Sequence, residues 1–294
     1  MGALCIGWTA MGAAPTGRYK DVVDKMTSLQ QQYASISSMF SIGQNDDGVD
    51  IYAMRISLTP AKIDPSKVGY LVVGTHHGNE LYAATFTVEF LQSVLARYTS
   101  SELVHSTLPE TEWTFVPVLN VSGYNADDRY EHGQDPNRDY PGPCISAAGG
   151  KLKSIRLMMN LLDTRIFTGS LTVHGYLGGL TYPWGVDVSD THTKDQNLYD
   201  SLFSKAAALN GYRYGTSTDV VYPCDGAFED YVYWKKGIYS MLLELVSGSD
   251  QDRADTLKAT TLYFDSLEAS PSVSNQFTTQ CRSQHERRPD PHLE

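Results

Sequence analysis

Short, largely apolar runs alternate with longer amphipathic segments along this chain, and this alternation restricts the fold more than any other feature. The apolar runs cover residues 69–73, 113–119, 170–173 and 239–245, and apolar residues recur at helical spacing in 80–97, 152–162, 198–209 and 254–267. Nearly uniform apolar strands separated by helices are typical of a parallel sheet that is buried on both faces. We therefore predict an α/β fold with helices on both faces of the sheet.

The first part of the chain adds an antiparallel element. A helical segment at 19–33 precedes two strand-like runs, 39–43 and 51–56, which flank Asn-Asp-Asp-Gly at 45–48. Such a segment between two strands favours a β-hairpin. We therefore expect a mixed, mostly parallel twisted sheet, and sheets of this kind place their sites beyond the carboxyl ends of the strands.

The chain has no Gly/Ser-rich or Pro-rich linker, and its 294 residues suit one large domain. We assign 1–18 to an N-terminal arm or a signal or propeptide remnant, 19–270 to one folded domain, and 271–294 to a C-terminal tail. Residues 3–15 resemble the apolar core and cleavage zone of a secretory signal without its basic start, which predicts a secreted or periplasmic protein. An ordered or cloning-derived arm is the alternative.

Charge, hydropathy and cysteine content exclude several classes of function. With 23 basic and 34 acidic residues the net charge is -11, which argues against nucleic-acid binding and mildly favours cationic substrates. No run reaches the ~18 apolar residues of a membrane span. The four cysteines (Cys5, Cys144, Cys224, Cys281) lack a C-x-x-C spacing, so a cysteine metal site is not expected and one disulfide is possible. We expect a monomer.

Metal-ligand chemistry appears where the strand at 69–73 ends. His77 and Glu80 stand three residues apart around Gly78-Asn79, a sequence suited to a turn, so both side chains can converge on one ion. His174 ends the strand at 170–173 and is the best candidate for a third ligand. The alternative is that His77 caps the following helix and Glu80 lies in its first turn, where it favours the helix dipole.

A polar loop at 125–150 and one acidic residue in a late strand also point to a site. Loops of this length are usually functional or disordered. Arg129, Asn137 and Arg138 lie in it and are suited to gripping a carboxylate, although solvated loop charges are the alternative. Glu244 interrupts the apolar run 241–245, where a carboxylate is costly unless it is paired, metal-bound or faces a cavity. A strand end in contact with solvent is the alternative.

Taken in order, these motifs resemble the zinc metallocarboxypeptidase family (M14) related to pancreatic carboxypeptidase A. The resemblance spans residues 19–268 and implies a single domain with a sheet of about eight strands. One departure is Asn-Val-Ser-Gly-Tyr at 120–124 in place of the family's Asn-Pro-Asp-Gly-Tyr turn. The matching motifs are His77 and Glu80, the turn at 120–124, Arg129, the Asp-Pro-Asn-Arg-Asp-Tyr box at 135–140, His174 with Tyr-Pro-Trp-Gly at 182–185, Tyr222, and Glu244 in Leu-Glu-Leu.

The resemblance implies a role for each matching residue around one zinc ion. His77, Glu80 and His174 would bind Zn²⁺, and two histidines with one glutamate are the ligand set of carboxypeptidase A. The catalytic roles would fall to Glu244 as general base and Arg129 as oxyanion donor. Asp135 would accept a hydrogen bond from His77. Asn137 and Arg138 would hold the terminal carboxylate of the substrate, and Tyr222 would close over it.

The resemblance also implies a residue that sets substrate preference, Glu229. Aligning Asp230-Tyr231 with the family pattern places Glu229 at the base of the pocket for the departing side chain, which implies a basic or diaminopimelate-type terminal residue. The alternative is an acid in the first turn of a helix at 227–236. Peptide C-termini or peptidoglycan stem peptides are thus the expected partners. An N-acyl-amino-acid deacylase on the same fold and a metal-free binding domain are the other readings, and the complete set of ligands and clamp residues counts against both.

Overall fold

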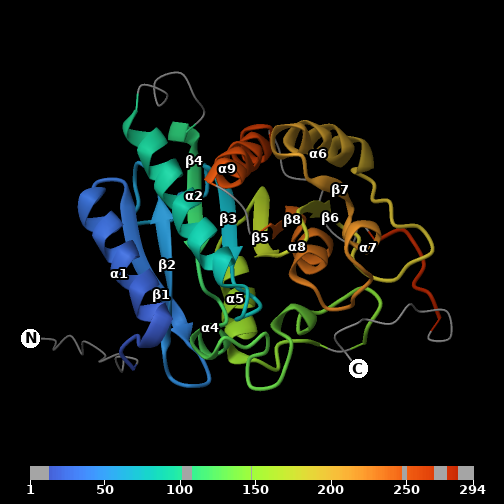
Figure 1. Cartoon of the computed structure of the whole chain (residues 1–294), viewed down its shortest axis with the longest axis horizontal. Helices are drawn as coiled ribbons and strands as arrows, with labels where there is room; N and C mark the ends of the chain where they lie inside the picture. Colours follow the sequence, from blue (N-terminus) through green and yellow to red (C-terminus); the bar gives the residue numbers. More distant parts are fainter. Residues whose placement is uncertain (1–12, 101–107, 147, 247–249, 268–276, 284–294) are drawn as a thin grey trace, which may run out of the picture.

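The computed structural model describes residues 13–100, 108–146, 148–246, 250–267 and 277–283 (Figure 1). Most of the predicted N-terminal arm and most of the predicted C-terminal tail therefore lie outside the described residues. Within the described part of the chain, no helix is long and apolar enough to cross a membrane.

The described strands form one sheet in the order β1-β2-β4-β3-β5-β8-β6-β7. The hairpin β1–β2 and the pairs β2–β4 and β6–β8 are antiparallel, whereas β3–β4, β3–β5, β5–β8 and β6–β7 are parallel. The prediction of a mixed, mostly parallel sheet of about eight strands is confirmed. The strands are β1 Ser37–Gln44, β2 Asp50–Ile56, β3 Val68–Gly74, β4 Thr111–Val116, β5 Gly169–Gly175, β6 Gly179–Tyr182, β7 Arg213–Thr216 and β8 Tyr239–Leu245.

Helices cover both faces of this sheet, as predicted (Figure 1). In β3, Tyr70 and Val72 enter a core shared with α2, α6 and α9, whereas Leu71 and Val73 enter a core shared with α5 and α8. The helices are α1 Gly17–Gln32, α2 Leu81–Thr99, α4 Val121–Ala126, α5 Lys153–Leu162, α6 Gln196–Asn210, α7 Ser217–Val220, α8 Phe228–Lys236 and α9 Asp250–Asp265, with short 3-10 turns η1 Leu108–Glu110 and η2 Pro136–Arg138.

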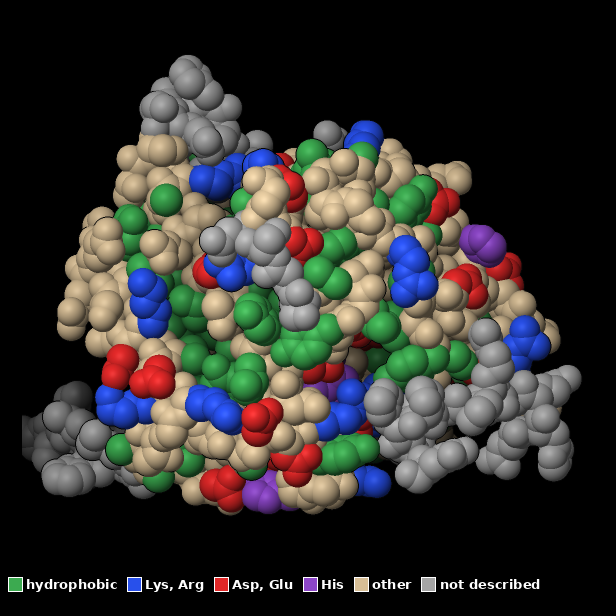
Figure 2. Space-filling view, viewed as in Figure 1, with side chains coloured by type: hydrophobic (Ala, Val, Ile, Leu, Met, Phe, Trp, Pro, Cys, Tyr) green, Lys and Arg blue, Asp and Glu red, His purple; other side chains and the backbone are tan. Residues whose placement is uncertain are grey.

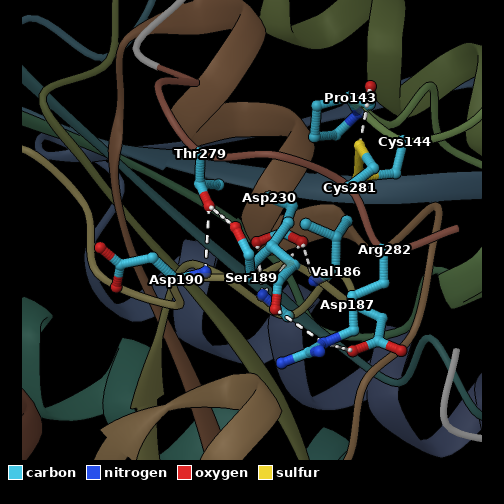
Figure 3. Close-up of a disulfide and its surroundings, with 12 residues drawn as sticks. Pro143, Cys144, Val186, Asp187, Ser189, Asp190, Asp230, Thr279, Cys281 and Arg282 are labelled. Atoms are coloured by element: carbon cyan, nitrogen blue, oxygen red, sulfur yellow. Dashed lines mark hydrogen bonds and ion pairs between the residues drawn. A yellow bond between two sulfur atoms is a disulfide. The ribbon is translucent and has the colours of Figure 1, made fainter. Parts of the chain in front are cut away.

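Two features differ from the expected layout of the chain. The segment 120–124, expected to be a turn, instead begins the short helix α4, and Asn120 caps this helix because its side chain accepts a hydrogen bond from the Gly123 backbone N–H. The second is that part of the region assigned to a tail, residues 277–283, packs on the domain. Cys281 forms a disulfide with Cys144, and Arg282 forms an ion pair with Asp187 (Figure 3).

Candidate metal centre and active site

The carboxyl ends of three adjacent parallel strands, β3, β5 and β8, meet at one edge of the sheet. At the end of β3, Thr75 has φ 57°, an unusual conformation for a β-branched residue that turns the chain sharply into His76 and His77. Gly78 follows where the backbone of Gly123 approaches so closely that a Cβ would lie 2.1 Å from its carbonyl carbon. This turn directs His77 and Glu80 towards β5.

The three candidate ligands converge in the interior. His77 Nδ1 lies 2.8 Å from Glu80 Oε1 and 3.1 Å from His174 Nδ1, and His174 Nδ1 lies 3.0 Å from Glu80 Oε2. All three side chains are buried, and they are the metal-ligand group found among the described residues. The helix-capping alternative for His77 is wrong, since α2 has no side-chain cap and the His77 ring contacts Glu80 and Asp135 instead.

A hairpin in the loop before η2 holds two further groups beside the ligands. Glu131 and Gln134 exchange backbone hydrogen bonds around His132 and Gly133, whose positive φ values suit a tight hairpin turn. The turn brings Arg129 back against Asp135, and the Nε and Nη2 atoms of Arg129 donate to Asp135 Oδ2 at 3.0 and 2.9 Å. Asp135 Oδ1 lies 3.1 Å from His77 Nε2, as expected for an acceptor that orients this ring.

Electrostatics at the ligands reflect their mutual proximity. Burial alone would raise the pKa of Asp135, but the hydrogen bond from His77 and the nearby Arg138 and Arg129 charges lower it far below its ordinary value. Burial likewise opposes ionisation of Glu80, yet His77 and His174 hold its pKa well below the ordinary range. Both carboxylates are therefore ionised beside the two histidines.

Glu244 lies directly beside the third ligand. The register of β5 and β8 pairs His174 with Glu244, so their side chains leave the sheet on the same face. Burial, together with the nearby Glu80 carboxylate, raises the pKa of Glu244 to about 8. Its side chain is buried and lines the pocket that holds His77 and His174, which excludes the solvent-exposed alternative.

The same pocket is lined by the residues expected to hold a carboxylate. The Arg138 Nη2 atom donates to Tyr222 Oη at 3.2 Å, and its guanidinium lies 5.7 Å from the centre of the Tyr222 ring. Asn137 is buried, and its Oδ1 atom accepts a hydrogen bond from the Phe228 backbone N–H at 2.8 Å. Figure 2 shows basic, acidic and histidine side chains gathered around a hollow near the centre of one face.

The adjacent acids Glu229 and Asp230 have different environments. Asp230 accepts hydrogen bonds from the backbone N–H groups of Gly185 and Val186, so it anchors that segment (Figure 3). Glu229 lies in the first turn of α8, as the alternative reading held, but it also lines the pocket and is 1% exposed, with Oε2 lacking a hydrogen-bond partner. Burial raises the pKa of Glu229.

Sequence reasoning missed two buried polar residues next to the ligands. Thr172 Oγ1 lies 3.0 Å from His174 Nε2 and also 3.0 Å from His76 Nδ1. The available signals were a polar residue two positions before His174 in an apolar strand, and a second histidine adjacent to His77. Neither signal alone separates a ligand-supporting residue from an ordinary core residue.

Comparison with known proteins agrees with this fold. Carboxypeptidase M from Mus musculus is 22% identical over 258 residues, covering 75% of this chain and 57% of the relative. The fold is similar to that of thrombin activatable fibrinolysis inhibitor (TM-score 0.73, 17% identity, 84% of this chain and 73% of that one). It is also similar to murein-tripeptide amidase MpaA from Escherichia coli O157 (TM-score 0.51, 15% identity, 77% and 90%).

The matched part of the chain spans 57% of carboxypeptidase M and 14% of carboxypeptidase D from Homo sapiens, so it covers only part of these curated relatives. The family model described as "Zinc carboxypeptidase" matches residues 22–260, most of the described domain. The metal-ligand cluster, the neighbouring Glu244 and the sheet all lie within that match. The chain therefore belongs to the zinc carboxypeptidase family.

Proposed function

We propose that this chain is a zinc-dependent metallocarboxypeptidase that hydrolyses the C-terminal peptide bond of peptides. The observation that carries the proposal is a single pocket lined by two candidate metal ligands, Glu244, and a group of side chains suited to a terminal carboxylate. An internal peptide bond offers no such anion, so this arrangement favours release of the last residue. Residues 19–270 would form the catalytic domain.

The donor set fits zinc. The Nε2 atoms of His77 and His174 face Asp135 and Thr172, which leaves both Nδ1 lone pairs directed at each other and at Glu80. Lone pairs this close repel unless a proton or a cation lies between them. A tetrahedral zinc ion bound at 2.0–2.1 Å separates neighbouring ligand atoms by about 3.3 Å, close to the observed spacing.

The chemistry would be divided among the ligands and five other side chains. Zinc bound here would polarise the scissile carbonyl and lower the pKa of a water molecule. Glu244 would take the proton of that water and deliver it to the leaving amine. Arg129, held in place by Asp135, would donate to the carbonyl oxygen as negative charge develops there. Arg138 and Asn137 would bind the terminal carboxylate, with Tyr222 beside it.

Glu229 supports a basic or diaminopimelate-type terminal residue as the preferred leaving group. Its unpartnered, buried carboxylate oxygen beside the clamp is a costly arrangement that an amine of the substrate would relieve. The fold similarity to a murein-tripeptide amidase also favours peptidoglycan stem peptides as the natural substrates. The disulfide between Cys144 and Cys281 supports a secreted or periplasmic location, since disulfides persist in oxidising compartments.

The proposed base is tested with Glu244→Gln. This variant keeps the size of the side chain and removes its basicity, so bound zinc measured by elemental analysis should be unchanged while kcat falls on the order of 10²–10⁴-fold. Glu110→Gln, at an exposed position, is the matched control. A near-normal rate for Glu244→Gln would exclude Glu244 from this role.

The proposed substrate preference is tested with peptides that differ only in the last residue. We expect terminal Lys, Arg or diaminopimelate to be released faster than Phe or Leu, and Glu229→Gln to reduce this preference on the order of 10²-fold. Peptidoglycan stem tripeptides belong in the same panel. A preference for Phe that is the same in the wild type and in Glu229→Gln would contradict the assignment.

A further inference from the structure

The two ligand histidines differ in the group that contacts the ring nitrogen not directed at the metal site. His77 Nε2 faces the carboxylate of Asp135 at 3.1 Å, whereas His174 Nε2 faces the hydroxyl of Thr172 at 3.0 Å. Thr172 is fully buried on β5, two residues before His174, so both side chains leave the strand on the same face. A hydroxyl can donate or accept, so it does not by itself fix the proton on the His174 ring.

A second buried histidine removes this ambiguity. His76 Nδ1 lies 3.0 Å from Thr172 Oγ1, and His76 Nε2 lies 3.0 Å from Tyr140 Oη. The His76 ring stacks on the His174 ring with a centroid distance of 5.5 Å and an interplanar angle of 11°. His76, Thr172 and Tyr140 are all fully buried, so water does not compete for these contacts.

The hydrogen bonds then have one assignment of directions that also uses the hydroxyl proton of Thr172. Metal binding through His174 Nδ1 leaves the proton on Nε2, which must donate to Thr172 Oγ1. The single hydroxyl proton of Thr172 is then free to donate to His76 Nδ1. In this assignment a neutral His76 carries its proton on Nε2, which donates to Tyr140 Oη. Each of the three contacts has one donor and one acceptor.

We propose that Thr172, His76 and Tyr140 form a hydrogen-bond relay that fixes the tautomer and ring orientation of His174 for metal binding. These three are positioning residues, since none is placed to touch the metal or substrate. The relay performs for His174 what Asp135 performs for His77, but with neutral groups, so it adds no negative charge to the site. This inference rests on the proposed zinc site and concerns which residues of this chain support it.

The test measures zinc affinity directly in the full chain, by competition with a chromophoric chelator. Thr172→Val has almost the same shape as threonine but no hydroxyl, and we expect the Kd for Zn²⁺ to rise 10–100-fold. Thr172→Ser keeps the hydroxyl, so its Kd for Zn²⁺ should stay within about threefold of the wild-type value. A change this small is well below the 10–100-fold effect expected when a supporting partner is lost. Thr114→Val, a buried threonine on β4, which carries no candidate ligand, is the matched control.

A second pair of variants covers the case in which Thr172→Val does not fold. His76→Asn places an oxygen acceptor near the position of Nδ1, whereas His76→Leu places none, so zinc should bind more tightly to His76→Asn. Nitrogen-detected NMR of the zinc-bound wild type should also show the His174 ring protonated at Nε2.

The outcomes separate the two proposals. Equal zinc affinities for the wild type, Thr172→Val and His76→Leu would overturn the relay while leaving the zinc site intact. A wild-type chain that does not bind Zn²⁺ would instead overturn the proposed function itself. Loss of affinity in Thr172→Val and Thr172→Ser alike would show that packing, and not the hydroxyl, supports His174, and would also overturn the relay.

Discussion

Replacing Glu131 by glutamine is expected to remove a pH-dependent cost of folding. Glu131 anchors the hairpin that places Arg129 against Asp135, and its side chain is fully buried. One carboxyl oxygen is hydrogen-bonded to the Ser154 hydroxyl at the start of α5, and the other has no partner. Burial therefore raises the pKa of Glu131 to about 7, with the charges of Asp46 and Asp47 acting in the same direction.

The sign and size of the effect follow from that pKa. In the unfolded chain the carboxyl ionises near pH 4.5, but in the folded protein it keeps its proton up to about pH 7. Folding thus binds a proton between these values, and the free energy of unfolding falls as the pH rises through this window. At 1.36 kcal/mol for each pH unit, the loss is about 3 kcal/mol between pH 4 and pH 8.

The assay is urea unfolding at pH 4.5, 6 and 8 with the metal removed from every sample. Glu131→Gln cannot ionise, so the difference in unfolding free energy between variant and wild type should move in favour of the variant by about 2–3 kcal/mol across this range. Glu110→Gln, at an exposed site, is the control for loss of one negative charge. A difference for Glu131→Gln that does not change with pH would refute the reasoning.

Three further changes have defined outcomes. Gly78→Ala should lower stability and zinc affinity, because its Cβ would lie 2.1 Å from the carbonyl carbon of Gly123; a variant that keeps both would contradict this close approach. Asp135→Asn should raise the Kd for Zn²⁺ by 10–100-fold, measured by chelator competition, and an unchanged Kd would separate Asp135 from ligand orientation. Cys281→Ser removes a crosslink with a sequence separation of 137 and should lower the melting temperature, with up to about 5 kcal/mol as the chain-entropy limit. Because Cys144→Ser breaks the same bond, the double variant should be no less stable than either single one, and additive losses would contradict the pairing.

Much of the fold could be predicted from the sequence because its signals are local. The apolar runs that became β3, β4, β5 and β8 are long enough to be recognised, and the Asn-Asp-Asp-Gly segment marks the hairpin of β1 and β2. The short strands β6 and β7 were not individually predicted. Each has four residues and is stabilised by pairing with a neighbouring strand, which no local pattern reveals.

The candidate site, like the fold, could be predicted from the sequence only in part. Four residues stand out because polar side chains at the ends of apolar strands are costly unless they are paired, bind a metal or face a cavity. They are His77, Glu80, His174 and Glu244. Their convergence, however, depends on β3, β5 and β8 lying side by side, and the distinction between Glu229 and Asp230 depends on which carboxylate meets the Gly185 backbone.

The sequence by itself therefore determined the α/β class, the membership of the chain in a family, and the residue types available for chemistry, because these depend on periodicity and on ordered motifs. Only the tertiary structure decided which side chains share hydrogen bonds. His76 meets Thr172 from a position 96 residues away, and Cys281 meets Cys144 across a separation of 137. Contacts of this kind depend on how the strands and loops pack in space, which local sequence does not encode.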